Sequence, residues 1–170
     1  MGIEKVAVIG AGTMGAGIAQ VCAQSGWNTA LYDAFPEGLE KGMQRIEAFW
    51  QKGIARGKTT VEQKQEWSKN LHAESNLEDA VNGCDLIIEA VPEILELKQK
   101  IFQEVEQYAS QQAVFATNTS SLSIGKIAGA INYPKRLIGM HFFNPVPIMK
   151  LLELVKHDQT SDATITVAEA

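Results

Sequence analysis

One stretch near the N-terminus, KVAVIGAGTMGAGIAQ, restricts the possible folds of this chain more than any other. It places Gly10, Gly12 and Gly15 in G-x-G-x-x-G spacing, directly after an apolar β-branched run and directly before a helical pattern. In that context the first glycine allows a tight turn, the second lets a pyrophosphate approach the backbone, and the third lets helix and strand pack closely. The amides at the helix N-terminus then face the phosphates. The stretch therefore predicts a dinucleotide site, with Thr13 and Met14 in the same loop.

An acidic residue stands at the distance from the glycines that such a loop requires. Asp33 ends the next predicted strand, about twenty residues further along the chain. Its carboxylate can accept hydrogen bonds from both ribose hydroxyls and repels a 2′-phosphate, which favours NAD over NADP. FAD shares the same fingerprint and is an alternative ligand, and a glycine-rich turn in an unrelated fold is the alternative without a ligand.

Apolar runs of strand length alternate with amphipathic stretches of helical length, which is typical of a parallel sheet covered by helices. The predicted strands are Lys5–Gly10, Thr29–Asp33, Asp85–Val91, Val114–Thr117, Leu137–Phe142 and Leu151–Val155. The predicted helices are Met14–Ser25, Pro36–Lys58, Val61–Asn70, Leu77–Val81, Ile94–Ala109 and Ser123–Ala130. This order predicts a Rossmann-type, doubly wound α/β domain with a mostly parallel sheet. The polar helical pair inserted after the second strand should protrude from it and serve a ligand.

The composition narrows the classes of function. The chain has 170 residues, 45% of them hydrophobic and 21% charged, with a net charge of -5, which suits one folded domain. There is no basic field for nucleic acid or anionic lipid, and the apolar runs are shorter than a membrane span requires. The N-terminus lacks the pattern of a signal peptide, so we expect a cytoplasmic location. Cys22 and Cys84 lie inside predicted elements without metal-ligand spacing, which predicts core thiols rather than a disulfide or zinc site.

Polar side chains follow two further predicted strands, at the sheet edge where a nucleotide should lie. After Glu89 the segment IIEAVPEILELKQK turns and offers Glu93 and Lys98 to the crevice. A turn with a surface ion pair is the alternative interpretation. The segment FATNTSSLS brings an amide and three hydroxyls, and a helix cap can explain only one of them. These four residues are Asn118, Thr119, Ser120 and Ser121.

A histidine and a glutamate stand in the otherwise apolar stretch MHFFNPVPIMKLLEL. His141 comes near the end of a predicted strand, so it should reach the same sheet edge as the glycine loop. Glu153 lies between leucines on the returning strand, where an unpaired carboxylate is unfavourable. Pairing the two would fix the imidazole tautomer and leave the other ring nitrogen as a general base. A satisfied core histidine is the alternative, but the nucleotide loop and the polar NTSS turn favour catalysis.

Three motifs, GAGTMGAGIAQ, TNTSSLSI and HFFNPVPIMKLLELV, together resemble the 3-hydroxyacyl-CoA dehydrogenase family over nearly the whole chain. The resemblance implies that His141 is the catalytic base, Glu153 its partner and Ser120 a substrate contact. The preference for Ser120 over Ser121 rests on this resemblance alone. It also implies NAD as the cofactor and an acyl-CoA as the substrate. The further NAD contacts that it implies are Asn144, Glu93 and Lys98.

The resemblance further implies reversible oxidation of a (3S)-3-hydroxyacyl-CoA to the 3-oxoacyl-CoA. Members of the family bind CoA along the helical pair, where Lys52, Arg56 and Lys58 are candidate phosphate partners here. They continue into a C-terminal helical domain that closes the active site and forms a homodimer. We therefore expect residues 1–170 to be the NAD-binding domain, able to bind NAD but with little turnover alone. A sugar-acid dehydrogenase of the same architecture and a non-catalytic NAD-binding module are the alternatives.

Overall fold

A seven-stranded sheet lies at the centre of the structure, a computed structural model that describes residues 2–170. The strand order is β3-β2-β1-β4-β5-β6-β7, with every neighbouring pair parallel except β6 and β7. This arrangement confirms the predicted doubly wound α/β fold. The strands are β1 (Lys5–Ile9), β2 (Asn28–Tyr32), β3 (Leu71–Glu74), β4 (Leu86–Glu89), β5 (Val114–Thr117), β6 (Leu137–Phe142) and β7 (Leu152–Val155).

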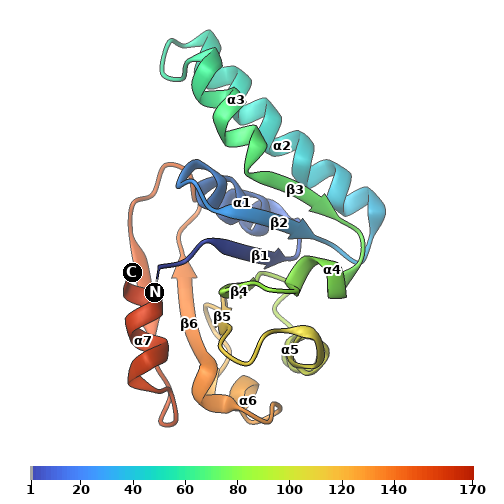
Figure 1. Ribbon diagram of the computed structural model, residues 1–170, viewed down its shortest axis with the longest axis vertical. Coiled ribbons are helices and arrows are strands. Elements are labelled where there is room, and N and C mark those ends of the chain that lie inside the picture. The colour runs from blue at the N-terminus through green and yellow to red at the C-terminus, as the bar shows by residue number, and fades with distance from the viewer. Residues whose placement is uncertain (1) are drawn as a thin grey trace.

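Helices cover both faces of the sheet (Figure 1). Helices α1 and α7 pack against one face, and α4, α5 and α6 pack against the other, so the core is divided into two apolar layers. Within residues 2–170, no helix is long and apolar enough to cross a membrane. The helices are α1 (Thr13–Gln24), α2 (Pro36–Ala55), α3 (Val61–Lys69), α4 (Leu77–Val81), α5 (Leu95–Tyr108), α6 (Ile124–Ala128) and α7 (Asp162–Glu169), with a 3₁₀ turn at Pro134–Arg136.

The helical pair α2 and α3 protrudes from the sheet, as the sequence predicts (Figure 1). Its base packs tightly on the glycine loop, because a Cβ at Gly42 of α2 would lie 2.7 Å from the carbonyl oxygen of Ala11. Further out, the rings of Trp50 and Trp67 join the two helices with centroids 5.8 Å apart. A capping box at Thr60 begins α3. The pair therefore has a fixed base beside the predicted nucleotide site and a free tip.

Strand β3 is the one element of the sheet that the sequence pattern did not predict. It lies at the sheet edge beside β2, and its four residues read LHAE. Only Leu71 is buried, while His72 and Ala73 are exposed, so the short run lacks the apolar pattern of the central strands. Edge pairing with β2, rather than side-chain burial, makes this segment a strand.

Both cysteines are buried and free, which confirms the expected core thiols. Cys22 lies in α1 and belongs to the apolar layer on that face of the sheet. Cys84 directly precedes the loop into β4 and belongs to the apolar layer on the opposite face. Burial raises the pKa of the Cys22 thiol to about 12 and that of Cys84 to about 11. Both thiols are therefore protonated at neutral pH.

Candidate active site

The glycine loop joins β1 to α1 at the carboxyl edge of the parallel strands. Gly10 has a φ of +103°, and a Cβ there would lie 2.7 Å from the carbonyl oxygen of Ala90. A Cβ at Gly15 would overlap the carbonyl oxygen of Gly10, so only glycine lets α1 approach β1 this closely. A Cβ at Gly12 would meet nothing within 4 Å. The space above Gly12 is therefore open at the helix N-terminus, where an anion is favoured.

Asp33 directly follows β2, lies at the rim of the glycine loop and accepts a hydrogen bond from its backbone. Its Oδ2 accepts a hydrogen bond from the amide of Ala11 at 2.8 Å, and its Oδ1 accepts one from the amide of Phe35 at 2.9 Å. A carboxylate has about four lone-pair positions, so the two amides leave capacity for two hydroxyl donors. A cavity of about 470 Å³ adjoins the loop and is lined by Gly10, Asp33 and apolar side chains from both sides. This edge of the loop therefore offers a dinucleotide an adjoining cavity and free acceptor positions on Asp33.

A second cavity of about 340 Å³ continues the first along the strand ends. Met14, Ala90 and Val91 line both cavities, which makes the two hollows neighbours at the sheet edge. The residues that the sequence singles out after separate strands meet in this second cavity. They are Glu93, Lys98, Asn118, Ser120, His141 and Asn144.

Lys98 is not part of a surface ion pair, and that alternative interpretation is wrong. The residue is 1% exposed, and its Nζ lies 2.6 Å from Glu89 Oε2 and 3.5 Å from Glu93 Oε1. Packing of α5 against the sheet buries the side chain. Glu89 itself is fully buried at the end of β4. The sequence pattern alone gave Glu89 no role, although a charged residue at the end of a buried strand is a signal of a functional group.

Glu93 lines the second cavity and accepts hydrogen bonds from the NTSS segment. Thr119 Oγ1 donates to Glu93 Oε1 at 2.6 Å, and the amide and hydroxyl of Ser120 donate to Oε2 at 3.0 and 3.2 Å. Partial burial by itself would raise the pKa of Glu93. The hydrogen bonds from Thr119 and Ser120 and the charge of Lys98 outweigh it and lower this pKa below its ordinary value. Glu93 is therefore a carboxylate at neutral pH.

His141 and Glu153 face each other across the antiparallel pair β6 and β7. His141 Nδ1 lies 3.5 Å from Glu153 Oε2, and the ring of Phe143 packs 4.6 Å from the imidazole. Within residues 2–170 the Nε2 atom has no hydrogen-bond partner, and the residue lines the second cavity. The two side chains are in contact as expected, at a distance longer than that of an ordinary hydrogen bond. The expected burial of Glu153 is wrong, because β7 is an edge strand and leaves that side chain 54% exposed.

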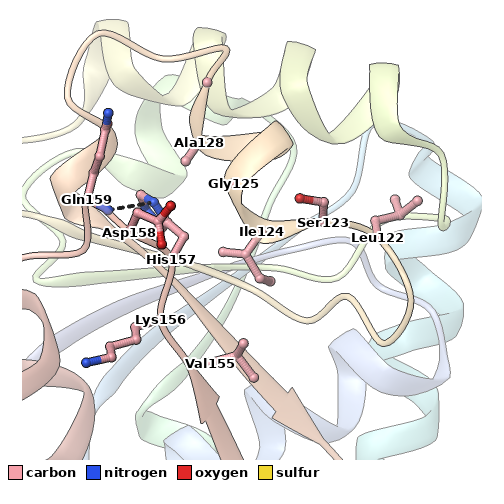
Figure 2. Close-up of a pocket in the computed structure, with 11 residues that line it drawn as sticks. Leu122, Ser123, Ile124, Gly125, Ala128, Val155, Lys156, His157, Asp158 and Gln159 are labelled. Carbon is pink, nitrogen blue, oxygen red and sulfur yellow. Dashed lines mark hydrogen bonds between the residues drawn. The ribbon is translucent and has the colours of Figure 1, made fainter.

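A separate cavity of about 590 Å³ lies between α6 and the segment after β7 (Figure 2). Its histidine, His157, has both ring nitrogens engaged by backbone groups, one in the local turn and one in the 3₁₀ turn that precedes β6. Nε2 lies 2.9 Å from the carbonyl oxygen of Pro134, and Nδ1 accepts the amide of Gln159 at 3.3 Å. This ring therefore maintains backbone structure, in contrast to His141, whose Nε2 is available to a ligand.

The basic candidates on the helical pair do not line the two cavities. Lys52 is exposed on α2, Arg56 is exposed at its C-cap, and Lys58 is exposed in the loop that joins α2 to α3. Sequence reasoning missed Arg45, which lies on the same face of α2 as Lys52 and Arg56, seven and eleven residues before them. Its Nη1 lies 3.5 Å from the carbonyl oxygen of Ala11. The helical spacing of these three residues could have predicted this. Arg45 extends the basic face of α2 to the glycine loop.

The order of the strands, the glycine turn and the acidic rim define a Rossmann-type dinucleotide-binding domain. The chain belongs to the family described as 3-hydroxyacyl-CoA dehydrogenase, NAD binding domain, whose sequence model matches residues 5–170. That description confirms NAD as the predicted cofactor and the family resemblance of the three motifs.

Named relatives agree with this family. The chain is 43% identical over 90% of its length to the 3-hydroxyadipyl-CoA dehydrogenase of Escherichia coli K12, of which it covers 32%. It is 40% identical over 98% of its length to the 3-hydroxybutyryl-CoA dehydrogenase of Bradyrhizobium diazoefficiens, of which it covers 57%. Among solved structures, the (S)-3-hydroxybutyryl-CoA dehydrogenase of Ralstonia eutropha superposes with a TM-score of 0.94 at 38% identity, over 98% of this chain and 59% of that one. The chain thus spans between about a third and three fifths of these relatives.

Proposed function

We propose that the protein containing this chain catalyses the reversible, NAD-dependent oxidation of (3S)-3-hydroxyacyl-CoA to 3-oxoacyl-CoA, as in fatty acid β-oxidation or related short-chain acyl-CoA metabolism. The observation that carries the proposal is the His141–Glu153 pair, whose histidine lines the cavity that adjoins the glycine-loop cavity. A base beside a nicotinamide site suits removal of a hydroxyl proton during hydride transfer. The names of the relatives support a hydroxyacyl-CoA as the substrate class.

In the proposed reaction His141 Nε2 accepts the proton of the substrate 3-hydroxyl group as the C3–O bond becomes a carbonyl. Glu153 faces Nδ1 and stabilises the imidazolium that forms. The hydroxyl of Ser120 lies on the rim of the same cavity and can donate to the reacting oxygen. When bound, NAD supplies the acceptor for the hydride that leaves C3.

The chain offers NAD a set of contacts along the sheet edge. The amides of Thr13 and Met14 at the start of α1 would hold the pyrophosphate, and Asp33 would accept hydrogen bonds from the adenosine ribose. Glu93, Lys98 and Asn144 line the second cavity, where they would hold the nicotinamide half.

The exposed basic face of α2 suits the phosphates of CoA. Lys52 and Arg56, with Lys58 in the following loop, would bind them near the free tip, and Arg45 would bind them near the glycine loop. Arg45 also lines a cavity of about 140 Å³ together with Thr13 and Asn144, which leads from this face towards the second cavity. The acyl end of the substrate would reach His141 along this route.

The test uses the complete protein with NADH and acetoacetyl-CoA, followed by the loss of nicotinamide absorbance. Turnover with acetoacetyl-CoA and none with sugar-acid substrates supports the proposal. The reverse preference would assign the site to a sugar-acid dehydrogenase. NADH binding without turnover of any of these substrates would favour the non-catalytic alternative.

A further inference from the structure

Glu89 and Lys98 form a buried ion pair, and the proposed function gives Glu89 no role. Their exposed fractions are 0% and 1%, and their charged atoms lie 2.6 Å apart. Thr117 Oγ1 donates to Glu89 Oε1 at 2.6 Å, and the amide of Val91 donates to Oε2 at 2.8 Å. Replacing a buried ion pair by apolar side chains of similar volume is often neutral or stabilising. Stability alone therefore does not account for this pair.

The pair fixes the direction of the Lys98 ammonium group. An ammonium has three N–H donors, and here two of them are taken by Glu89 Oε2 and by the carbonyl oxygen of Val91 at 3.1 Å. The Nζ then lies 3.5 Å from Glu93 Oε1, at the wall of the second cavity. Glu89 thus holds a positive charge beside Glu93.

Glu93 is the hydrogen-bonding partner of the Ser120 loop. Both the amide and the hydroxyl of Ser120 donate to its Oε2, and Thr119 donates to its Oε1. A continuous series of polar contacts therefore runs from the buried Glu89 through Lys98 and Glu93 to Ser120. It begins on β4 and ends at the cavity that His141 also lines.

We propose that Glu89 is a positioning residue that holds Ser120 at the reacting oxygen through Lys98 and Glu93. This inference rests on the proposed function for the role of Ser120. As substrate binds, the Ser120 hydroxyl turns from Glu93 to the substrate oxygen. The hydrogen bond from the Ser120 backbone amide to Glu93 keeps the loop in place. In Glu89→Gln the neutral amide no longer fixes the ammonium, so Lys98 no longer holds the Glu93 carboxylate in place and the hydrogen bonds from Ser120 to Glu93 weaken.

The chain supplies a control in Glu106, a second hydrogen-bonded carboxylate, which is partly buried and lines neither cavity. Its oxygens accept the amides of Asn132 and Tyr133, both at 2.9 Å, and one lies 4.0 Å from Arg136 Nη2. Glu106→Gln therefore removes a carboxylate that also accepts two backbone amides and faces a cation, without touching the series that leads to Ser120. A purely structural role for Glu89 would give the two variants similar effects.

The first measurement is amide hydrogen exchange on the complete protein. In Glu89→Gln the segment containing Ser120 should exchange about tenfold faster, because a hydrogen bond to a charged acceptor is weakened, and in Glu106→Gln it should be unchanged. If Glu89→Gln does not fold, Glu89→Gln combined with Lys98→Met removes both charges and should fold while showing the same faster exchange. Unchanged exchange at Ser120 in the folded variant would overturn the proposal.

The second measurement is a double-mutant cycle on kcat with acetoacetyl-CoA and NADH. Glu89→Gln should lower kcat about tenfold in the wild-type background but less than about twofold in Ser120→Ala. Equal effects in both backgrounds would show that Glu89 does not act through Ser120. An inactive wild-type protein would refute the proposed function instead, and the exchange measurement would then decide the positioning role.

Discussion

Replacing Gly12 by alanine should separate folding from cofactor binding. Gly12 is the N-cap of α1 with φ -70° and ψ -169°, a conformation that alanine adopts, and a Cβ there meets nothing within 4 Å. Loss of chain entropy in the unfolded state favours alanine by about 0.4–1 kcal/mol, and the poorer cap costs a similar amount. The free energy of unfolding of Gly12→Ala should therefore stay within about 1 kcal/mol of wild type.

NAD binding should respond very differently, because the new methyl group occupies the space through which the pyrophosphate reaches the loop amides. Loss of one hydrogen bond to a charged group costs about 1.5–3 kcal/mol, which weakens NADH about tenfold to a hundredfold. Urea unfolding and calorimetric titration with NADH measure the two quantities. Gly10→Ala is the contrasting variant, since its φ of +103° and the contact with Ala90 should destabilise the fold by about 1–3 kcal/mol or more. Wild-type NADH affinity in Gly12→Ala would refute the placement of the pyrophosphate.

Three further predictions concern single groups. NADP should bind much more weakly than NAD, and Asp33→Ala should narrow that preference while lowering NAD affinity; equal affinities of wild type for the two cofactors in calorimetry would contradict this role. The folded-state pKa of Glu93 is lowered, so the ionised carboxylate contributes fully to stability above the ordinary pKa of 4.5. This contribution is lost as the pH falls through the folded-state pKa. The difference in free energy of unfolding between wild type and Glu93→Gln should therefore shrink at acid pH, as measured by unfolding titrations. Cys22 and Cys84 should react with a thiol reagent only after unfolding, and modification of the native protein would show that their burial is incomplete.

The parts of the fold that the sequence predicts are those that bury continuous apolar runs. Strands β1, β4 and β5 are recognisable because nearly every side chain in them is buried. Strand β3 escapes prediction because it lies at the edge and buries only Leu71. The residue type in a loop is predictable where the backbone requires a positive φ. Gly10 has such a φ, which few other residues adopt.

The site is predictable as a set of residues but not as a set of contacts. Parallel strands bring their carboxyl ends to one edge, so the residues after β4, β5 and β6 were expected to meet there. The burial of Lys98 depends on how α5 packs back on β4, which no local pattern encodes. The exposure of Glu153 likewise follows from the edge position of β7, although its leucine neighbours suggest burial.

The central claim is that His141 is the base of a dehydrogenation, and kcat of His141→Gln in the complete protein tests it most directly. The variant should reduce acetoacetyl-CoA with a kcat lower by about a hundredfold or more, because the base acts in the transition state. Its affinity for NADH should stay within about twofold of wild type, since the ring is proposed to contact the reacting hydroxyl. His157→Gln, which loses only a structural ring, should keep a near-normal kcat. Near-normal turnover in His141→Gln would contradict the account.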